Sequence, residues 1–434
     1  MALATWLYVS GVMLFILFTD ALFGVSGQSL AYGPLTAALV VLLLRGMTRG
    51  PRNFLQLWYV SGPMMLPGAL FLTGLAISMP NAHEVGLAAK DFLRWSFVWL
   101  AFAPATRAIC STPERCRLMT RIAAGLIVAF AAVAAGDLIT GGTLTPRLIG
   151  REGITAAGRY MSVYGNPGIF AGMLTVGLPL SLMVAMRSRR WPAKLGWGAG
   201  TALIFAGMLL TGSRITLATA AVACLVIFLT ERRWWALAGA SVVFAAAMLT
   251  PVSALLGGAP TVARVEETVS GVGSGERSLQ RRLLIWSVAL EIIREHPVFG
   301  AGGAQLRFAQ HAGFKRAHNA WLDAWLDGGL PAALAMLVVT GLVLGRAWRT
   351  LTGRVARYRH PTHIALVAAS CAVLVGWTVR AGIGGRIDWL PVFLLFAGCW
   401  DLAPAPEEQP AGWSSRPSPE PCRDMEVLPH PQGS

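Results

Sequence analysis

Long apolar runs constrain this chain more than any other feature, because about 20 mainly apolar residues are enough for a helix to cross a bilayer. Twelve such runs occur, at residues 5–24, 29–45, 57–79, 86–106, 118–139, 164–185, 195–212, 214–230, 234–252, 329–346, 363–380 and 387–403. Only 13% of the 434 residues are charged, about half the share found in soluble domains. The sequence therefore predicts an all-α integral membrane protein with about twelve transmembrane helices.

The charges of the connecting loops predict how these spans are oriented. Cytoplasmic loops of membrane proteins carry an excess of Lys and Arg, and the loops after spans 2, 4, 6, 8 and 10 are all basic. We expect these loops and both termini to be cytoplasmic, with residues 5–24 retained as the first span. The same arginines explain the net charge of +15 through contacts with membrane lipids, so no nucleic-acid partner is expected.

The chain is expected to divide into a polytopic membrane domain, residues 1–403, and a tail, residues 404–434, that is rich in Pro, Ser and Glu. This composition predicts a disordered cytoplasmic tail. The membrane domain includes a large outer segment, residues 253–328, between spans 9 and 10. Apolar residues at 285, 288, 289 and 292 predict a helix there. Ser278 is its expected N-cap, and Pro297 follows its expected end.

Another amphipathic helix is predicted at the end of this outer segment, in the stretch "FKRAHNAWLDAWLDGGL" at residues 314–330. Helical spacing puts His318 on one face of that helix. Asn319, Asp323 and Asp327 fall on another face. We expect such helices to lie at the outer membrane interface, with tryptophans at the depth of the headgroups.

Arginines on the predicted outer side contradict the orientation rule and need a separate explanation. The guanidinium group donates paired hydrogen bonds that match phosphate oxygens, so a convergent set predicts a pyrophosphate-binding site. The alternative is that each arginine reaches a lipid phosphate, which the tight Gly-Ser turn before Arg214 makes harder. The candidates are Arg147, Arg151, Arg159, Arg214, Arg281 and Arg282.

His318 is the candidate catalytic residue, because a neutral imidazole can accept a proton from a sugar hydroxyl near pH 7. A purely structural histidine is the alternative. Trp286 lies one helical turn from Arg282, and it either packs in the core or fixes the helix beneath bound phosphates. The residues expected to support the site are Lys315, Arg316, Asn319, Trp286 and Asp323.

Motifs for metals and nucleotides are poorly represented in the sequence. The six cysteines have no CxxC spacing, and the predicted outer loops have no Asp-x-Asp pair. The glycines at 300–303 follow no strand, so they predict a turn rather than a nucleotide-binding loop. No metal and no cofactor is expected. Lys90, Asp91 and Arg94 fall within span 86–106, where they either serve a function or show that the span starts later.

Four strings together resemble the O-antigen ligase and polymerase superfamily. They are "YGNPGIFAGML" (164–174), "TGSRITLA" (211–218), "RLLIWSVALEIIREHPVFGAG" (282–302) and "HNAWLDAWLDGGLPA" (318–332). The superfamily has a Gly-Ser-Arg turn, then Arg-x-x-x-Trp, then His-Pro-x-x-Gly-x-Gly, then His-Asn before a span. All four elements occur here in that order, over a core of about residues 160–345.

The resemblance implies a GT-C-like membrane glycosyltransferase at the periplasmic face of a Gram-negative inner membrane. Ligases of this kind move a glycan from undecaprenyl pyrophosphate to lipid A–core without a metal, and the single large outer segment favours this activity. Arg214 and Arg282 match the arginines expected at the donor pyrophosphate, and His318 matches the expected catalytic histidine. The donor lipid, the lipid A–core acceptor and membrane lipids are the expected partners.

Other functions remain open at this stage. Within the superfamily the chain can be an O-antigen polymerase or a protein O-oligosaccharyltransferase. A lipid or solute transporter would need charges along a path through the membrane midplane and a repeat symmetry. A scaffold without catalysis would tolerate loss of the outer arginines.

Overall fold

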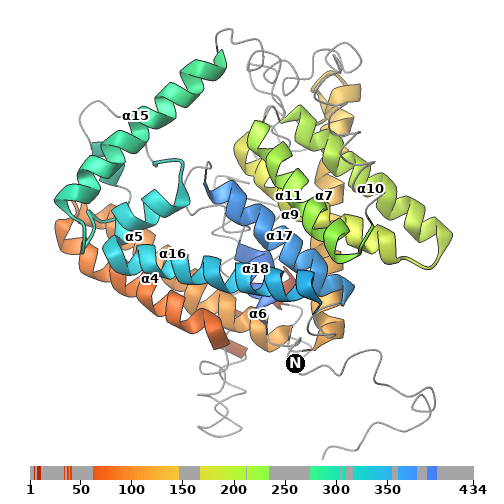
Figure 1. Ribbon diagram of the computed structural model, residues 1–434, viewed down its shortest axis with the longest axis horizontal. Coiled ribbons are helices and arrows are strands. Elements are labelled where there is room, and N and C mark those ends of the chain that lie inside the picture. The colour runs from red at the N-terminus through yellow and green to blue at the C-terminus, as the bar shows by residue number, and fades with distance from the viewer. Residues whose placement is uncertain are drawn as a thin grey trace, which may run out of the picture.

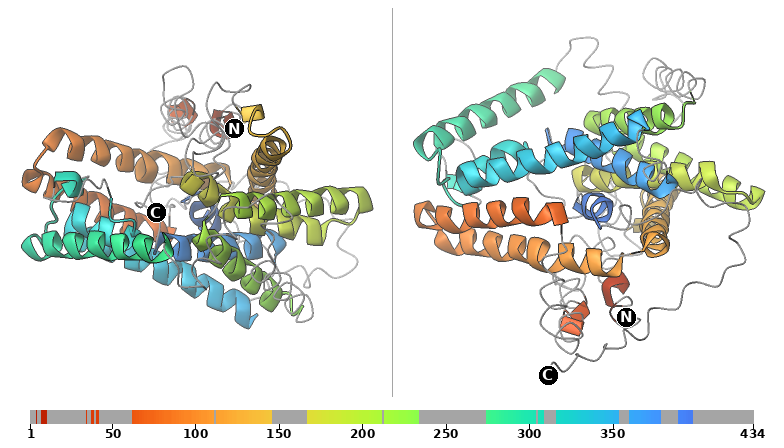
Figure 2. Two further views of the ribbon diagram at one scale, coloured as in Figure 1. Left: turned by 90° about the horizontal axis from the view of Figure 1, so that it is seen from above. Right: turned by 60° about the horizontal axis from the view of Figure 1, so that its bottom comes forward.

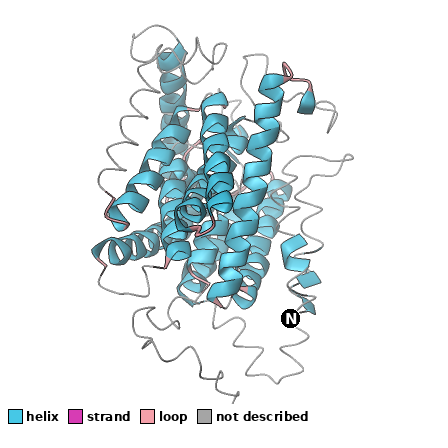
Figure 3. Cartoon of the chain, turned by 90° about the vertical axis from the view of Figure 1, so that its right-hand side faces the viewer, coloured by secondary structure: helices cyan, strands magenta, loops and turns pink. Residues whose placement is uncertain are grey.

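The computed structural model describes residues 62–110, 112–145, 167–211, 213–233, 274–303, 305–308, 316–353, 360–378 and 389–397, and a few positions between 4 and 41. All regular structure in these residues is helical (Figure 3). Five described helices are long and apolar enough to cross a membrane: Gly62–Asn81, Pro113–Ile139, Pro167–Arg187, Trp191–Leu210 and Ala320–Thr352. The predicted all-α membrane protein is confirmed for this part. The count of twelve stays a prediction, because spans 5–24, 29–45 and 234–252 fall largely or wholly outside the described residues.

One group of helices consists of α4 (Met65–Ser78), α5 (Val85–Phe97) and α16 (Ala320–Thr352), which run side by side in Figures 1 and 2. The end of α4 packs against the start of α16. A Cβ atom on Gly74 would lie 2.4 Å from the carbonyl oxygen of Gly328. Glycine therefore lets these two helices approach more closely than any larger residue would, as is common between membrane helices.

A second group consists of α7 (Pro113–Ile139), α9 (Pro167–Arg187), α10 (Trp191–Leu210) and α11 (Arg214–Thr230), at the right of Figure 1. Helix α17 (Pro361–Trp377) joins the two groups, since it packs against α9 and α11 on one side and α16 on the other. Nearly all residues of α17 are buried. A helix that is apolar all round, as α17 is, can occupy this central position.

Aromatic side chains fill the space between α4, α17 and the short helix α18 (Trp389–Leu395). Trp389 is fully buried, and its ring centroid lies 4.8 Å from that of Trp377 and 5.0 Å from that of Trp99. Phe71 of α4 packs edge-on against Trp95 at 5.0 Å. Edge-on and offset aromatic pairs are favourable beyond their burial, so this cluster gives the joined helices a well-defined packing.

Polar contacts define two opposite ends of the bundle. At one end Arg117 near the start of α7 bonds His360 before α17 at 2.9 Å, and Arg187 at the end of α9 pairs with Glu231 after α11 at 2.6 Å. Arg346 near the end of α16 lies over Phe396 there. We call this the basic end. The starts of α11 and α16 lie at the opposite end, because each helix runs from there toward the basic end.

Two of the predicted runs form helices that are arranged differently from the prediction. The run predicted at 86–106 continues from α5 through a π-helix, Val98–Phe102, and α6, Ala103–Ile109. It is not among the five described helices that are long and apolar enough to cross a membrane. Residues 320–330 of the predicted stretch 314–330 continue into span 329–346 as one helix, α16, with a kink at Gly329.

Candidate functional site

Helix α15 (Ser274–Glu295) lies along the start of α16, at the upper left of Figure 1. The face of α15 predicted from apolar spacing packs there, with Ile285, Ala289 and Ile293 buried against Leu326. The predicted N-cap is wrong, because the helix already begins at Ser274 and Ser278 lies within it. The predicted end is confirmed, since the helix stops two residues before Pro297.

The turn after α15 inserts into the kink of α16. The backbone N–H of Leu330 donates to the carbonyl oxygen of Val298 at 3.0 Å, and that of Ala301 donates to Leu326 at 2.8 Å. Gly329 has a φ of 65°, and a Cβ atom on it would lie 2.1 Å from the Val298 oxygen. Only glycine fits such a backbone position without strain. The glycine-containing segments at 298–301 and 326–330 therefore contact each other.

The same turn is attached to the corner between α4 and α5. Asn81 donates from its side-chain amide to the carbonyl oxygen of Gly300 at 2.9 Å, and the backbone N–H of Glu84 donates to the side chain of Gln305 at 3.1 Å. Gln305 begins the short 3₁₀ helix Gln305–Phe308. Helix α15 and the start of α16 are thus fixed to the apolar helices at several points.

His318 lies outside the helix that the sequence predicted for it. Helix α16 begins at Ala320, and Asn319 is its N-cap, accepting hydrogen bonds from the backbone N–H groups of Trp321 and Leu322 at 3.0 and 3.2 Å. The predicted position of His318 on a helix face is therefore wrong. His318 has a φ of 55°, a left-handed conformation that costs an L-residue about 1–2 kcal/mol.

The residue before His318 is held from both sides, which explains how this conformation persists. Trp286 on α15 donates from Nε1 to the carbonyl oxygen of Ala317 at 2.9 Å. The N–H of Ala317 donates to the carboxylate of Asp323 at 2.7 Å. Ala317 is completely buried. Because Asn319 is also held by its cap, the surrounding structure determines the backbone of His318 at both of its neighbours.

Arg316 attaches the start of this loop to α5. Its guanidinium group pairs with Asp327 on α16 and with Asp91 on α5, the second at 2.6 Å. Asp91 also pairs with Arg94, three residues further along α5, at 3.2 Å. Burial alone would lower the pKa of Arg316, but Asp327 and Asp91 raise it overall, so the guanidinium stays charged. The charges of α5 thus position the loop that carries His318.

His318 is half-buried and close to two arginines of α15. Burial, followed by the charges of Arg282 and Arg281, lowers the pKa of His318 below its ordinary value. All three effects disfavour the imidazolium ion. His318 is therefore neutral at pH 7 and has a ring nitrogen that can accept a proton. Of the site residues predicted from the sequence, the structure brings together His318, Arg281, Arg282, Trp286 and Asn319.

The remaining predicted site residues are described only partly or not at all. Arg214 is the first residue of α11, at the end of the bundle opposite Glu231, and 17 helical residues correspond to roughly 25 Å. Its side chain falls outside the described part. The other predicted residues outside the described part are Arg147, Arg151, Arg159 and Lys315.

Two features of the site were missed from the sequence. The attachment of Asp91 to Arg316 was missed, although the unexplained charges in span 86–106 were a signal for it. No pattern in the sequence indicated the hydrogen bonds to the backbone of Ala317, because alanine carries no functional side chain. Among the described residues no group of three or more His, Cys, Asp or Glu side chains could hold a metal ion.

Comparison with known proteins connects this geometry to a family. Residues 199–337 match the model of the family described as O-antigen ligase. No curated protein matches the chain. The matched segment contains the second half of α10, all of α11 and α15, and the first half of α16. It therefore includes every part of the site except the corner of α4 and α5. The family indicates a membrane glycosyltransferase-like enzyme that acts on lipid-linked substrates. Over residues 199–337, this chain is similar to the O-antigen ligase family.

Proposed function

We propose that this protein is an O-antigen ligase that transfers a glycan from undecaprenyl pyrophosphate to a sugar hydroxyl of lipid A–core. The reaction takes place at the end of the bundle that carries His318, which faces the periplasm of a Gram-negative inner membrane. Both substrates are lipids presented at that surface. The family match over residues 199–337 supports this class of reaction.

In this mechanism His318 is the general base. The hydroxyl oxygen of the acceptor forms a bond to the anomeric carbon of the donor glycan while its proton moves to the neutral imidazole. The bond from that carbon to the pyrophosphate oxygen breaks, and undecaprenyl pyrophosphate leaves with the electron pair. No nucleotide is needed, because the pyrophosphate is already an activated leaving group.

Arginines of α15 and α11 stabilise the leaving group. Arg282, Arg281 and Arg214 donate charge-assisted hydrogen bonds to the pyrophosphate oxygens, where negative charge grows in the transition state. Arg147, Arg151 and Arg159 extend this binding surface by virtue of their charge and predicted side. Each hydrogen bond to a charged group contributes about 1.5–3 kcal/mol, so a few of these residues suffice to hold the donor.

One observation carries the proposal more than any other. His318 is held in a left-handed backbone conformation by contacts to Ala317 and by the Asn319 cap, beside the arginines of α15. A strained residue that its surroundings determine so closely is typical of a functional site. A histidine needed only for packing would not require such a conformation.

A transfer assay with two acceptors tests the proposal. The full chain in nanodiscs is supplied with undecaprenyl-pyrophosphate glycan and either lipid A–core or a second donor molecule. We expect a single glycan on lipid A–core, and a decrease of roughly 10²–10⁴-fold for His318→Gln, the range typical of a lost general base. His83→Gln is the control, because His83 is exposed near the same end of the bundle.

The outcomes separate the candidate functions. Chain growth on the second donor would instead identify a polymerase and keep the role of His318. Activity of His318→Gln within a few-fold of the unchanged protein would refute the general-base role. If the protein binds the donor but transfers the glycan to neither acceptor, the ligase proposal is wrong.

A further inference from the structure

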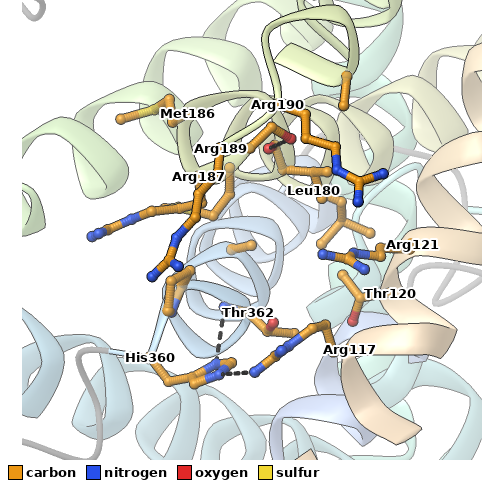
Figure 4. Close-up of a pocket in the computed structure, with 16 residues that line it drawn as sticks. Arg117, Thr120, Arg121, Leu180, Met186, Arg187, Arg189, Arg190, His360 and Thr362 are labelled. Carbon is orange, nitrogen blue, oxygen red and sulfur yellow. Dashed lines mark hydrogen bonds between the residues drawn. The ribbon is translucent and has the colours of Figure 1, made fainter. Parts of the chain in front are cut away.

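A cavity of about 870 Å³ lies at the basic end, opposite the end that carries His318. Three segments surround it: the start of α7, the turn between α9 and α10, and the start of α17 (Figure 4). Its volume falls within the range of about 300–1,000 Å³ that is usual for small-molecule sites. The proposed transferase reaction does not use it. Its charged and titratable lining residues are Arg117, Arg121, Arg187, Arg189, Arg190 and His360.

The lining of this cavity is strongly positive. Five arginines contribute to it, and no Asp or Glu is among the described residues that line it. In Figure 4 Arg117 and Arg121 reach in from α7, and Arg190 reaches from the turn above them. Arg187 pairs with Glu231 beside the cavity, which neutralises only that one charge.

His360 does not add to the positive charge at neutral pH. Burial lowers its pKa to about 4, helped by Arg117, while Glu114 acts in the opposite direction and Arg187 adds to the decrease. A guanidinium group can only donate, so the Nε2 atom of His360 accepts the hydrogen bond from Arg117 at 2.9 Å. This bond holds Arg117 at the cavity wall.

Helix ends add to the positive potential. Helices α7, α10 and α17 all begin at the cavity, with Thr112, Arg190 and His360 as their N-cap residues. The N-terminus of a helix carries a partial positive charge and N–H groups that suit anions. The side chain of Arg190 makes no cap hydrogen bond to α10. Helix α9 ends here, and Arg187 in its last turn offsets the opposite sign of that helix end.

The floor of the cavity is apolar. Leu180, Met183 and Ala365 line it and are almost completely buried, with exposed fractions of 1%, 2% and 1%. The arginines around its opening are exposed. Loop arginines that only orient the chain in the membrane need neither a shared cavity nor an apolar floor. This combination suits a ligand with an anionic group and an adjoining apolar part.

We propose that this cavity is a binding site for a phosphate group at the face of the protein opposite the transferase site. The arginines hold the phosphate oxygens, and the apolar floor contacts the carbon skeleton that bears the phosphate. An anionic phospholipid headgroup and a soluble phosphate compound are the two sources of this chemistry. Basic pockets between membrane helices are known to bind phosphorylated headgroups.

Binding measurements on the full chain test this site. Lipid binding is followed by native mass spectrometry in detergent with phosphatidylglycerol or phosphatidylcholine, and soluble binding by calorimetry with inorganic pyrophosphate. The test variant is Arg121→Gln with Arg190→Gln. The control variant is Arg115→Gln with Arg349→Gln, which removes the same charge outside the cavity lining. Thermal unfolding in detergent confirms that both variants are folded.

Two results support the site and distinguish its ligand. Selective binding of phosphatidylglycerol, weakened at least about tenfold (~1.4 kcal/mol) in the test variant and less than twofold in the control, identifies a lipid phosphate. The same pattern with pyrophosphate, and no preference among lipids, identifies a soluble phosphate. Equal weakening in both variants, or no phosphate-dependent binding to the unchanged protein, overturns the proposal.

Discussion

The hydrogen bond from Trp286 to Ala317 gives the sharpest prediction for the site. Trp286→Phe keeps an aromatic ring on α15 but removes the N–H that lies 2.9 Å from the carbonyl oxygen of Ala317. Because Ala317 is fully buried, its carbonyl loses a partner that bulk water cannot easily replace. Such a loss costs about 1–3 kcal/mol.

We expect the lost hydrogen bond to destabilise the conformation of the loop that holds His318. If the whole ~1–3 kcal/mol destabilises that conformation, the fraction of protein with His318 in position decreases roughly 5- to 150-fold, since each 1.36 kcal/mol is about a factor of ten. The decrease should appear in kcat of glycan transfer and not in KM for the donor, because Arg281 and Arg282 stay on α15. Steady-state kinetics with varied donor concentration measures both constants.

Trp325→Phe is the matched control for this experiment. Trp325 also donates from Nε1 to a backbone oxygen, that of Pro297 at 2.8 Å, so the same bond is removed at a turn away from His318. We expect kcat of this variant to stay within about twofold of the unchanged protein. If both variants lose activity equally, or if Trp286→Phe keeps full kcat while folded, the positioning role of Trp286 is refuted.

Three further predictions concern charge. In a plot of kcat/KM against pH, the acidic limb should lie below pH 6.5, about the ordinary pKa of histidine, because burial and Arg282 lower the pKa of His318. Arg282→Gln should move this limb to higher pH. An acidic limb that stays in place would contradict the prediction. Arg316→Gln removes the guanidinium group that pairs with the buried carboxylates of Asp327 and Asp91, and it should lower the free energy of unfolding by about 3–5 kcal/mol. Arg94→Gln, at a side chain that is 42% exposed, should change the free energy of unfolding by less than about 1 kcal/mol. Thermal unfolding in detergent compares these two variants. Because the pKa of His360 is about 4, the free energy of unfolding should not depend on this residue above about pH 6.5 and should decrease as the pH falls from there toward 4. His360→Gln should remove that part of the pH dependence of unfolding, and an unchanged pH dependence would refute the prediction.

Local patterns predicted the elements of the site better than their arrangement. The apolar spacing on α15 correctly identified its buried face, because helical periodicity depends only on neighbouring residues. The start of that helix was placed five residues late, after an expected N-cap at Ser278, since a plausible capping side chain within a helix gives the same local signal as a true cap. The predicted turn at the glycines was confirmed for the same local reason.

The conformation of His318 could not be predicted in this way. The sequence pattern from His318 to Asp327 is helical throughout, and it gives no sign that the helix begins only at Ala320. Hydrogen bonds from Trp286 and Asp323 to Ala317 decide this boundary. One of these partners is 31 residues away along the chain, so no local pattern contains the information.

By itself, the sequence determined the all-α membrane character, the approximate positions of most described helices and the segments that carry charge. These properties follow from length, periodicity and the cost of placing charges in lipid, and all three are read along the chain. The tertiary structure alone decided that Asp91 and Arg316 pair, that the turn after α15 inserts at Gly329, and that five arginines from two separate segments line one cavity. Such contacts depend on how helices far apart in sequence pack together, and packing is specified by the shapes of facing surfaces rather than by any single segment.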